Sequence, residues 1–248
     1  MRLARSEEEV FASQRLRFRI FGDEMGGDLP EASVKAGRDF DEFDDVCDHL
    51  LVLDNEREGD DAIVGTYRLL RSSQMKKIGR YYTESEYDIT PLKAYSGELL
   101  ELGRSCVDAE YRNRAVMTLL WRGIGAFVKV FDIKLMFGCA SFFGDDPQKH
   151  AMALSYLYHH CMAPEEIRLT ALPDLYVDMN IVPLDQVDER EAIKTIPPLI
   201  KGYLRLNGKI GDGAVLDHVC KTTDVAIVVE TEQVGDKYAD RYKPEDPS

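Results

Sequence analysis

The sequence predicts an α/β fold in which helices flank a mixed, mostly antiparallel central sheet. Two apolar runs rich in β-forming residues, His49–Asp54 and Ile63–Leu70, are separated by the polar turn Asn55–Asp61, which indicates a β-hairpin. Two further strand-like runs, Leu99–Val107 and Ile133–Phe142, flank a segment whose apolar residues recur at helical spacing. An antiparallel start followed by strands that alternate with helices is typical of a mixed α/β sheet.

Three helices and one loop complete this expectation. The segment Val116–Val130 has one apolar and one polar face, so it is expected to pack on the sheet. Phe11–Phe21 mixes apolar and basic residues at helical spacing, and the glycine-containing stretch Gly22–Gly37 after it is expected to be an irregular loop. A helix over Asp146–Cys161 is predicted because an aspartate suited to the N-cap is followed by a proline.

Size and composition favour one folded domain. With 248 residues, 44% of them hydrophobic and 31% charged, the chain can bury about three quarters of its unfolded surface. We expect a single domain over residues 1–230, closed by the apolar strand Val225–Glu230, and a charged, loose tail over residues 231–248. No run of ~20 apolar residues is present to cross a bilayer, and the acidic N-terminal segment lacks the apolar core of a signal peptide.

Charge is uneven along the chain, and its sum argues against one class of partner. The net charge of −14 disfavours binding to nucleic acid or to an anionic membrane. Ten acids and two bases lie within residues 23–48, whereas five bases and no acid lie within residues 66–80. Such blocks are either solvated faces or the marks of a cationic small substrate and an acidic partner. The five cysteines show no CxxC spacing, so neither a disulfide framework nor a metal site is expected, and a reduced cytoplasm fits best.

The segment that joins the strand Leu99–Val107 to the next helix is the first candidate for a binding site. A strand that ends in a basic turn and opens a helix presents backbone N–H groups beside positive side chains, and the helix N-terminus adds partial positive charge. This arrangement suits a pyrophosphate or the phosphate of a phosphopantetheine arm. The residues concerned are Ser105, Cys106, Val107, Arg112, Arg114, Ala115 and Val116.

This segment resembles the acyl-donor loop of the GNAT superfamily of acyltransferases. That loop usually reads Arg or Gln, two residues, Gly, one residue, then Gly or Ala. Arg112 matches the leading basic residue, but Ala115 and its neighbours stand where glycines are usual. In this departure the chain is similar to the branch of GNAT-like proteins whose donor is acyl carrier protein. The resemblance implies a GNAT-like sheet with splayed central strands.

Two families of this branch share motifs with the chain. Acyl-homoserine-lactone synthases share four motifs in the same order, which here are Arg17 to Phe21, Asp45 with Asp48, Gly65 with Arg68, and Glu101 with Arg104. The chain resembles more fully the ornithine acyltransferases of bacterial ornithine-lipid synthesis, because further blocks are similar to theirs. These blocks are Leu119–Ile124, Met136–Phe142, Pro197–Arg205, Gly211–Ala214 and Thr222–Val225. The resemblance covers residues 15–230.

The resemblance implies direct acyl transfer to the α-amine of ornithine, without a covalent enzyme intermediate. A carboxylate near the amine can accept its proton directly or through water. Glu101 is the first candidate for this general base, and Asp48 is the second. The alternative for Glu101 is an ion pair with Arg104 that only fixes the strand, and both interpretations can hold together.

Binding of the amino acid is expected to use charges of both signs. Arg68 and Arg104 are candidates for binding its carboxylate, because a guanidinium recognises a carboxylate with two parallel hydrogen bonds. The acidic stretch 23–48, which includes the substrate-site candidate Asp45, is expected to bind the second ammonium of ornithine. The alternative for both arginines is a structural salt bridge to Asp45 or Asp48.

The donor that the resemblance implies is the acyl-phosphopantetheine of acyl carrier protein, and no bound cofactor is expected. Backbone N–H groups of Ser105–Val107 are then expected to meet the developing oxyanion, while Arg112 and Arg114 bind the phosphate. Acyl carrier protein is acidic, so a basic docking surface is also expected. Its candidates are Arg122, Lys129, Lys201, Arg205 and Lys209.

The expected activity is N-acyl transfer of a fatty or 3-hydroxyfatty acyl group from acyl carrier protein to L-ornithine, giving lyso-ornithine lipid. One alternative is an acyl-homoserine-lactone synthase, which requires S-adenosylmethionine. The other is a catalytically silent module that binds acyl carrier protein and does not need Glu101. The expected location is the cytoplasm, and the amphiphilic product is compatible with peripheral contact with the inner membrane.

Overall fold

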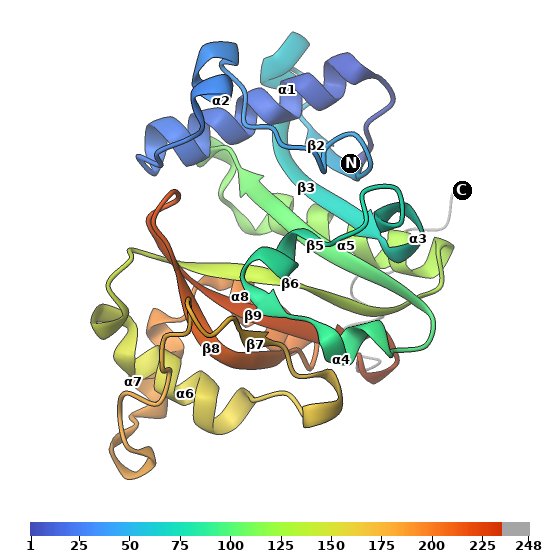
Figure 1. Cartoon of the computed structure of the whole chain (residues 1–248). Helices are drawn as coiled ribbons and strands as arrows, with labels where there is room; N and C mark the ends of the chain where they lie inside the picture. The colour runs from blue at the N-terminus through green and yellow to red at the C-terminus, as the bar shows by residue number, and fades with distance from the viewer. Residues whose placement is uncertain (235–248) are drawn as a thin grey trace. The chain divides into compact units, whose positions relative to one another are not determined.

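The chain divides into two compact units. The computed structural model describes residues 1–234. The first unit comprises Met1–Arg80 and Glu98–Ile133, and the second comprises Tyr81–Gly97 and the described residues from Lys134 onward (Figure 1). The predicted loose tail falls largely on residues 235–248, which lie outside the described residues. The single domain over residues 1–230 stays a prediction.

The first unit is built on an antiparallel sheet. Its strands, in spatial order, are β1 (Arg2–Leu3), β2 (Asp48–Leu53), β3 (Ile63–Arg71) and β5 (Glu98–Val107). The β2–β3 pair confirms the predicted hairpin, with the 3-10 turn η2 (Gly59–Ala62) before β3. Because successive side chains of a strand point to opposite faces, Leu51 and its partner Thr66 share one face, while Leu50 and its partner Tyr67 share the other.

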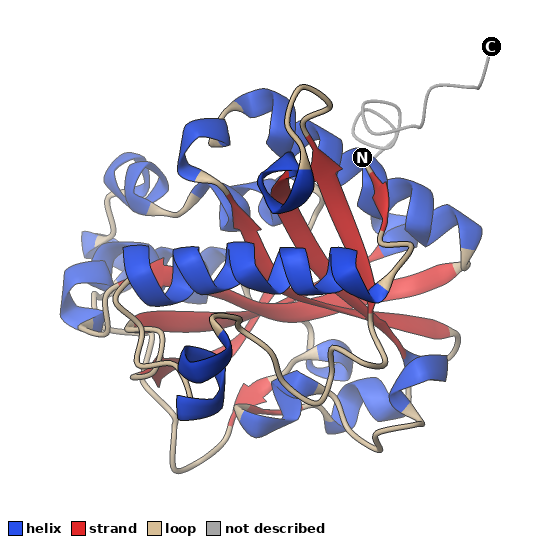
Figure 2. Ribbon diagram, turned by 90° about the horizontal axis from the view of Figure 1, so that it is seen from above, coloured by secondary structure: helices blue, strands red, loops and turns tan. Residues whose placement is uncertain are grey.

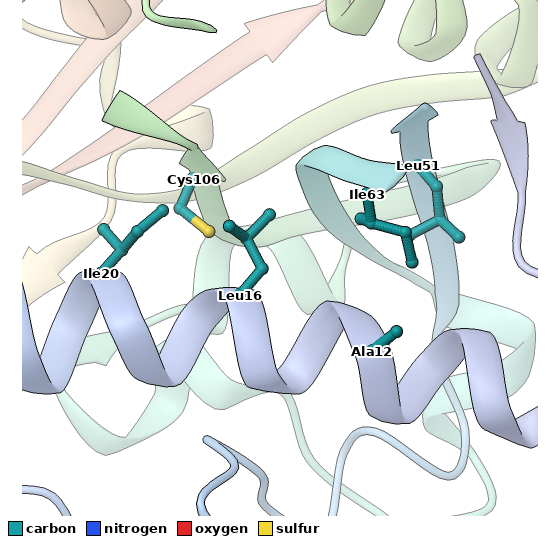
Figure 3. Close-up of a cluster of buried hydrophobic side chains, with 6 residues drawn as sticks. All are labelled: Ala12, Leu16, Ile20, Leu51, Ile63 and Cys106. Carbon is teal, nitrogen blue, oxygen red and sulfur yellow. The ribbon is translucent and has the colours of Figure 1, made fainter. Parts of the chain in front are cut away.

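Helices cover both faces of this sheet. On the face that we call the α1 face lies α1 (Glu7–Phe18), which continues as the π-helical turn η1 (Arg19–Glu24). There Ala12, Leu16 and Ile20 pack with Leu51, Ile63 and Cys106 (Figure 3). On the opposite α5 face lies α5 (Arg114–Val130), whose Gly123 approaches Leu50. A Cβ atom at Gly123 would lie 2.8 Å from the Leu50 side chain, so a larger residue here would force that side chain to shift.

The first unit also contains the short helices α2 (Glu31–Ala36) and α3 (Ser72–Met75). The expectation that Gly22–Gly37 is irregular throughout is wrong over α2. Pro30 precedes this helix, and Gly37 ends it with a φ of 62°. A proline at the start and a left-handed glycine at the end are helix boundary signals, and here they bound a helix of six residues.

The second unit has a mixed sheet. Its strands, in spatial order, are β6 (Ile133–Phe143), β9 (Thr222–Glu230), β8 (Lys209–Asp217), β7 (Thr170–Ala171) and β4 (Tyr87–Asp88). Only the β7–β8 pair of these is parallel. Its helices are α4 (Thr90–Lys93), α6 (Ala151–Cys161), α7 (Glu189–Thr195) and α8 (Pro198–Arg205). The side chain of Asp146 accepts a hydrogen bond from the Gln148 amide and caps the 3-10 turn that leads into α6, so the predicted cap is confirmed.

Helices and strands alternate along much of the described chain, although α7 is followed by α8 and β8 by β9. Figure 1 labels these elements and Figure 2 colours them by type. The predicted α/β class, with a mixed and mostly antiparallel strand arrangement flanked by helices, is confirmed. Splaying of the central strands stays a prediction. Within residues 1–234 no helix is both long and apolar enough to cross a membrane.

Candidate functional site

Glu101 lies in the middle of β5 with its side chain on the α1 face. It is 5% exposed and stands opposite Leu70 of β3. Arg68 is two positions away on β3, opposite Gly103, and its side chain therefore points to the same face. The first candidate for the base and one of the two arginine candidates are thus neighbours on one buried face of the sheet.

A β-bulge in β5 interrupts the ladder beside Glu101. Thr66 pairs with Cys106 and Arg68 pairs with Gly103, so three steps along β5 match two steps along β3. Arg104 has a φ of 51°, a left-handed conformation that is uncommon for residues other than glycine. A bulge leaves one residue unpaired and redirects side chains. It lies next to the N–H groups predicted to bind the oxyanion.

Arg17 of α1 is buried and binds two carboxylates of the segment Asp39–Asp44, which we call the acidic loop. Its Nε donates to Asp39 and its Nη1 donates to Asp44, both at 2.7 Å. The three side chains are only 1–4% exposed. Burial alone lowers the pKa of Arg17, but Asp44 and Asp39 outweigh it, so this pKa lies above its ordinary value. Arg17 is therefore a permanent charge that fixes the acidic loop on α1.

Arg68 and Arg104 contact the same acidic loop, but not equally closely. Arg68 Nη1 donates to Asp41 at 2.6 Å and lies 3.6 Å from Asp44. Arg104 lies 3.6 Å from both Asp39 and Asp41. The Arg104 side chain is 20% exposed, against 4% for Arg68. Of the two predicted carboxylate-binding residues, Arg104 has the longer contacts to the acidic loop and the more exposed side chain.

Asp45 and Asp48 occupy other places than the sequence analysis expected. Asp48 begins β2 on the α5 face, where its carboxylate accepts hydrogen bonds from Arg71 at 3.3 Å and Gln74 at 3.2 Å. Asp45 is exposed and has no ion pair among residues 1–234. The alternative of salt bridges from the arginine candidates to Asp45 or Asp48 is therefore wrong about the partners. Because side chains alternate along a strand, Asp48 points to the face opposite Glu101. The acidic loop supplies the carboxylates that contact Arg68 and Arg104 instead.

His49 adds a neutral side chain to this network. Its Nε2 lies 3.0 Å from the backbone carbonyl oxygen of Asp44, so this nitrogen carries the proton and donates. Its Nδ1 is buried and accepts no hydrogen bond from the described residues. Burial lowers the pKa of His49 in spite of the neighbouring Asp44. For Asp44 itself, burial raises the pKa, but Arg17 and Arg68 outweigh burial and hold it well below its usual range.

Two cysteines on this face are protonated at neutral pH. Burial raises the pKa of Cys47 to about 12 against the opposing charge of Arg68, and Asp44 and Glu101 add to the effect. Burial likewise raises the pKa of Cys106 to about 12. Because the thiolate is the nucleophilic form, neither thiol is activated to accept an acyl group. This agrees with direct transfer.

The predicted donor segment is a strand end, the 3-10 turn η4 (Ala109–Tyr111) and the start of α5. Asn113 caps the helix, and its side chain accepts from the amides of Ala115 at 2.9 Å and Val116 at 3.2 Å. These two amides already have a partner and cannot also bind a phosphate unless the cap opens. Arg114 is exposed.

Arg112 is held at the end of β5. Its Nε donates to the Val107 carbonyl at 3.1 Å, and both of its terminal nitrogens bind the Glu24 carboxylate of η1. Hydrogen bonding between the two side chains raises the pKa of Arg112 and lowers that of Glu24. Both side chains are 43% exposed. The charge of Arg112 is thus shared with Glu24, which would have to leave for Arg112 to bind a phosphate with both nitrogens.

Comparisons with known proteins place the chain in a family. Residues 16–122 match the family described as Acetyltransferase (GNAT) domain. An L-ornithine N(alpha)-acyltransferase of Agrobacterium fabrum is 47% identical over 97% of this chain and 84% of its own length. A second one, of Brucella abortus, is 44% identical over 99% of this chain and 89% of its own length. The chain belongs to the L-ornithine N(alpha)-acyltransferase family.

Solved structures at low identity agree with the fold of this family. FeeM, an N-acyl amino acid synthase from uncultured soil microbes, has a TM-score of 0.52 at 9% identity and covers 94% of this chain and 92% of its own. BjaI, a CoA-dependent acyl-homoserine lactone synthase, has a TM-score of 0.51 at 16% identity and covers 96% of this chain and 84% of its own. At these identities the likeness concerns the fold alone.

Residues predicted to dock a carrier protein on this family member come from both units. Arg122 and Lys129 lie on α5, whereas Lys201 and Arg205 lie on α8 and Lys209 begins β8. A single surface that joins them stays a prediction.

Sequence reasoning assigned the acidic stretch 23–48 to the site as a whole, but it singled out neither Asp39, Asp41 and Asp44 nor His49. The structure brings Asp39, Asp41, Asp44 and His49 together with Arg17, which the motifs had marked without a role. No signal in the sequence marked Arg17 as buried. Arg15 and Arg17 both adjoin the buried Leu16, yet the Arg15 side chain is 36% exposed and that of Arg17 only 1%.

Proposed function

We propose that the chain transfers a fatty or 3-hydroxyfatty acyl group from acyl carrier protein to the α-amine of L-ornithine and so produces lyso-ornithine lipid. The observation that carries this proposal is the nearly full-length relationship to L-ornithine N(alpha)-acyltransferases, at 41–47% identity. The buried network of the α1 face supports it, because such charges are kept where an amino acid must be held and deprotonated.

In this proposal Glu101 accepts the proton of the amine. The amine nitrogen attacks the thioester carbonyl, the C–N bond forms, and the C–S bond breaks as the phosphopantetheine thiol takes up a proton. Glu101 has the burial that suits a general base, and His49 offers a second, neutral acceptor nitrogen nearby on the same face. Asp48 is the weaker candidate, since it is paired with Arg71 on the opposite face.

Arg104 binds the carboxylate of ornithine in this scheme, while Arg68 holds the acidic loop. The 3.6 Å contacts of Arg104 can be exchanged for a closer, two-pronged interaction with a substrate carboxylate. Arg68 is already hydrogen-bonded to Asp41, which makes it a positioning residue. Asp45 is exposed and free of ion pairs among the described residues, so it is suited to attract the second ammonium.

The donor end of the scheme uses the bulged part of β5 and the turn after it. Backbone N–H groups of Ser105–Val107 stabilise the oxyanion, and Arg112 and Arg114 bind the phosphate of the carrier arm. Basic residues of α5 and α8 attract the acidic carrier protein. Acyl carrier protein is the preferred donor because Ala115 and its neighbours depart from the glycine pattern usual for coenzyme A.

One assay tests the proposal. Purified protein is incubated with 3-hydroxyacyl carrier protein or the matching acyl coenzyme A, and L-ornithine is compared as acceptor with lysine, glutamine and S-adenosylmethionine. Acyl-ornithine should form fastest with the carrier-protein donor. Thioester loss without acceptor preference contradicts the ornithine assignment, and a homoserine-lactone product supports the synthase alternative. Carrier binding without turnover, unchanged in Glu101→Gln, supports the silent module.

A further inference from the structure

A pocket in the second unit contains none of the residues assigned above. It is open to solvent and its volume is about 280 Å³, just below the ~300–1,000 Å³ range of pockets for drug-sized ligands, so any ligand it holds is small. Its lining residues come from the end of α6, from β8 and from the segment between them. The elements α6 and β8 contact each other (Figure 1). The lining residues are Tyr158, His159, Met162, Arg168 and Asp212.

A bulge in β8 brings Asp212 to the pocket. The pairing of β8 with β9 shifts register between Ile210 and Ala214, and Gly213 has a φ of 81°. A Cβ atom at Gly211 would lie 2.6 Å from the Leu169 carbonyl oxygen, and one at Gly213 would lie 2.5 Å from the Tyr176 ring. The Gly-Asp-Gly sequence is therefore required by close approach on both sides of Asp212.

The carboxylate of Asp212 has a neutral partner but no cationic one. The Tyr176 hydroxyl donates to its Oδ1 at 3.0 Å. Burial and this hydrogen bond raise the pKa of Tyr176 to about 12, so the hydroxyl remains a donor at neutral pH. Within residues 1–234 no basic side chain lies within the 4.0 Å of an ion pair to Asp212. Its negative charge is thus not compensated inside the fold.

Arg168 supplies the opposite charge to the same pocket. Its Nε donates to the Ala163 carbonyl at 2.8 Å, which fixes the direction of the guanidinium. Across the described chain no carboxylate lies within 4.0 Å of it, Asp212 included. The pocket therefore holds one positive and one negative group that are oriented by other contacts and are not paired with each other.

We propose that this pocket binds a free α-amino acid as a zwitterion, with its carboxylate on Arg168 and its α-ammonium on Asp212. Such a ligand supplies both missing counter-charges at once, whereas a simple anion or cation leaves one of them uncompensated. Met162 and Tyr158 offer apolar surface for the ligand's side chain. The site is additional to the acceptor site around Glu101 and does not depend on it.

Calorimetric titration of the full chain tests the proposal with probes that differ by one charge. L-norvaline carries both groups, L-norvalinamide lacks the carboxylate, and pentanoate lacks the ammonium. Norvaline should bind, and each of the other two should bind ~10- to 100-fold more weakly, because each loses one charge-assisted contact. If pentanoate binds as tightly as norvaline, the pocket is an anion site and the proposal is wrong.

Variants locate the binding. Asp212→Asn and Arg168→Gln should each weaken norvaline binding ~10- to 100-fold, while Arg168→Lys, which keeps the charge without the planar fork, should lie between. Matched surface controls in the same unit are Asp185→Asn and Arg190→Gln, both exposed, and they should bind as the unchanged chain does. Binding that is equal in Asp212→Asn and Asp185→Asn overturns the proposal, provided that both variants unfold at the same denaturant concentration.

Glu101→Gln separates this site from the acceptor site. Norvaline binding should persist in Glu101→Gln even though acyl transfer is lost. Loss of norvaline binding in that variant, together with its retention in Asp212→Asn, places the amino acid at the acceptor site and contradicts the second site. If no acyl transfer to ornithine is found in any condition, the proposed function fails, while the norvaline titration still decides the fate of this pocket.

Discussion

The two faces of the sheet in the first unit differ in how deeply their charged side chains are buried. On the α1 face, Arg17, Asp44 and Arg68 are all buried and are joined in one network. On the α5 face, Leu50 packs against Gly123, and the Asp48–Arg71 pair keeps 20–25% of its side chains exposed. Burying ion pairs brings little stability compared with apolar packing. The contrast is the structural reason for placing the proposed acceptor site on the α1 face.

The sharpest test of this contrast exchanges one carboxylate on each face. Glu101→Gln should lower kcat for ornithine acylation by ~10²- to 10⁴-fold, because it removes the proton acceptor. Asp48→Asn, its counterpart on the α5 face, should leave kcat within a few-fold of the unchanged chain. Steady-state kinetics with saturating donor measures both. An equal loss in the two variants would remove the functional distinction between the faces.

The buried ion pairs of Arg17 with Asp39 and Asp44 should contribute more to stability than the exposed ion pairs of the same helix. Arg17→Met removes the hydrogen-bonded counter-charge of the buried Asp39 and Asp44, which keep only the longer 3.6 Å contacts to Arg104 and Arg68, and should lower the free energy of unfolding by ~3–5 kcal/mol. Arg15 lies on the same helix as Arg17 and forms a half-exposed ion pair with Asp60. Arg15→Met removes this pair and should lower the free energy of unfolding by no more than ~1 kcal/mol. Urea unfolding followed by circular dichroism compares the two. Similar losses would show that burial does not set the strength of these pairs.

Arg104 should govern affinity more than turnover. Arg104→Gln should raise KM for ornithine by ~10- to 100-fold, since a charge-assisted bidentate contact is lost, and Arg104→Lys should recover part of it. The split between KM and kcat distinguishes substrate binding from general damage to the fold. A fall in kcat at constant KM would assign Arg104 to another task.

Acid should weaken the α1 face in two steps. The folded pKa of His49 lies below its unfolded value of about 6.5, so its contribution is complete above that pH and is lost as pH falls below it. The folded pKa of Asp44 is also lowered, so its contribution is lost only below about pH 4. His49→Gln should flatten the stability profile between pH 7 and 5. His218→Gln is the control, because His218 is 74% exposed.

The smallest effect is expected at the exposed Glu24–Arg112 pair. Glu24→Gln frees Arg112 for the carrier phosphate and should lower KM for acyl carrier protein by only ~2- to 5-fold, because exposed pairs are weak. Arg112→Glu should raise the same constant. Unchanged kinetics in both variants would remove Arg112 from the donor site.

Periodicity was sufficient to predict several of the longer elements, because buried apolar residues recur along the sequence at the spacing of a helix or a strand. The hairpin β2–β3, the strand β5 and the helix α5 were all recognisable in this way. The helix α2 was not, since the six residues between Pro30 and Gly37 are too few to show a clear period. Its only signals were Pro30 and Gly37, which also fit an irregular loop.

For the candidate site, the sequence predicted which residues take part, but not which acidic residues contact which arginines. Motif spacing singled out Glu101, Arg68 and Arg104, which the structure gathers on one face. It could not decide which acids meet the arginines, because that depends on strand alternation and on the path of an acidic loop far away in sequence. The sequence therefore suggested Asp45 or Asp48 as partners of the arginines, whereas the structure shows acids of the segment Asp39–Asp44 in this position.

The extra residue at Arg104 changes the phase of β5. Before it, odd-numbered side chains such as Glu101 point to the α1 face, and after it the even-numbered Cys106 does. If one residue were removed there, the pairing of β5 with β3 could be kept on only one side of the bulge. On the other side every side chain would change face, so either Glu101 or Cys106 would point away from α1. One strand can thus present a polar group for chemistry and an apolar group for packing to the same helix.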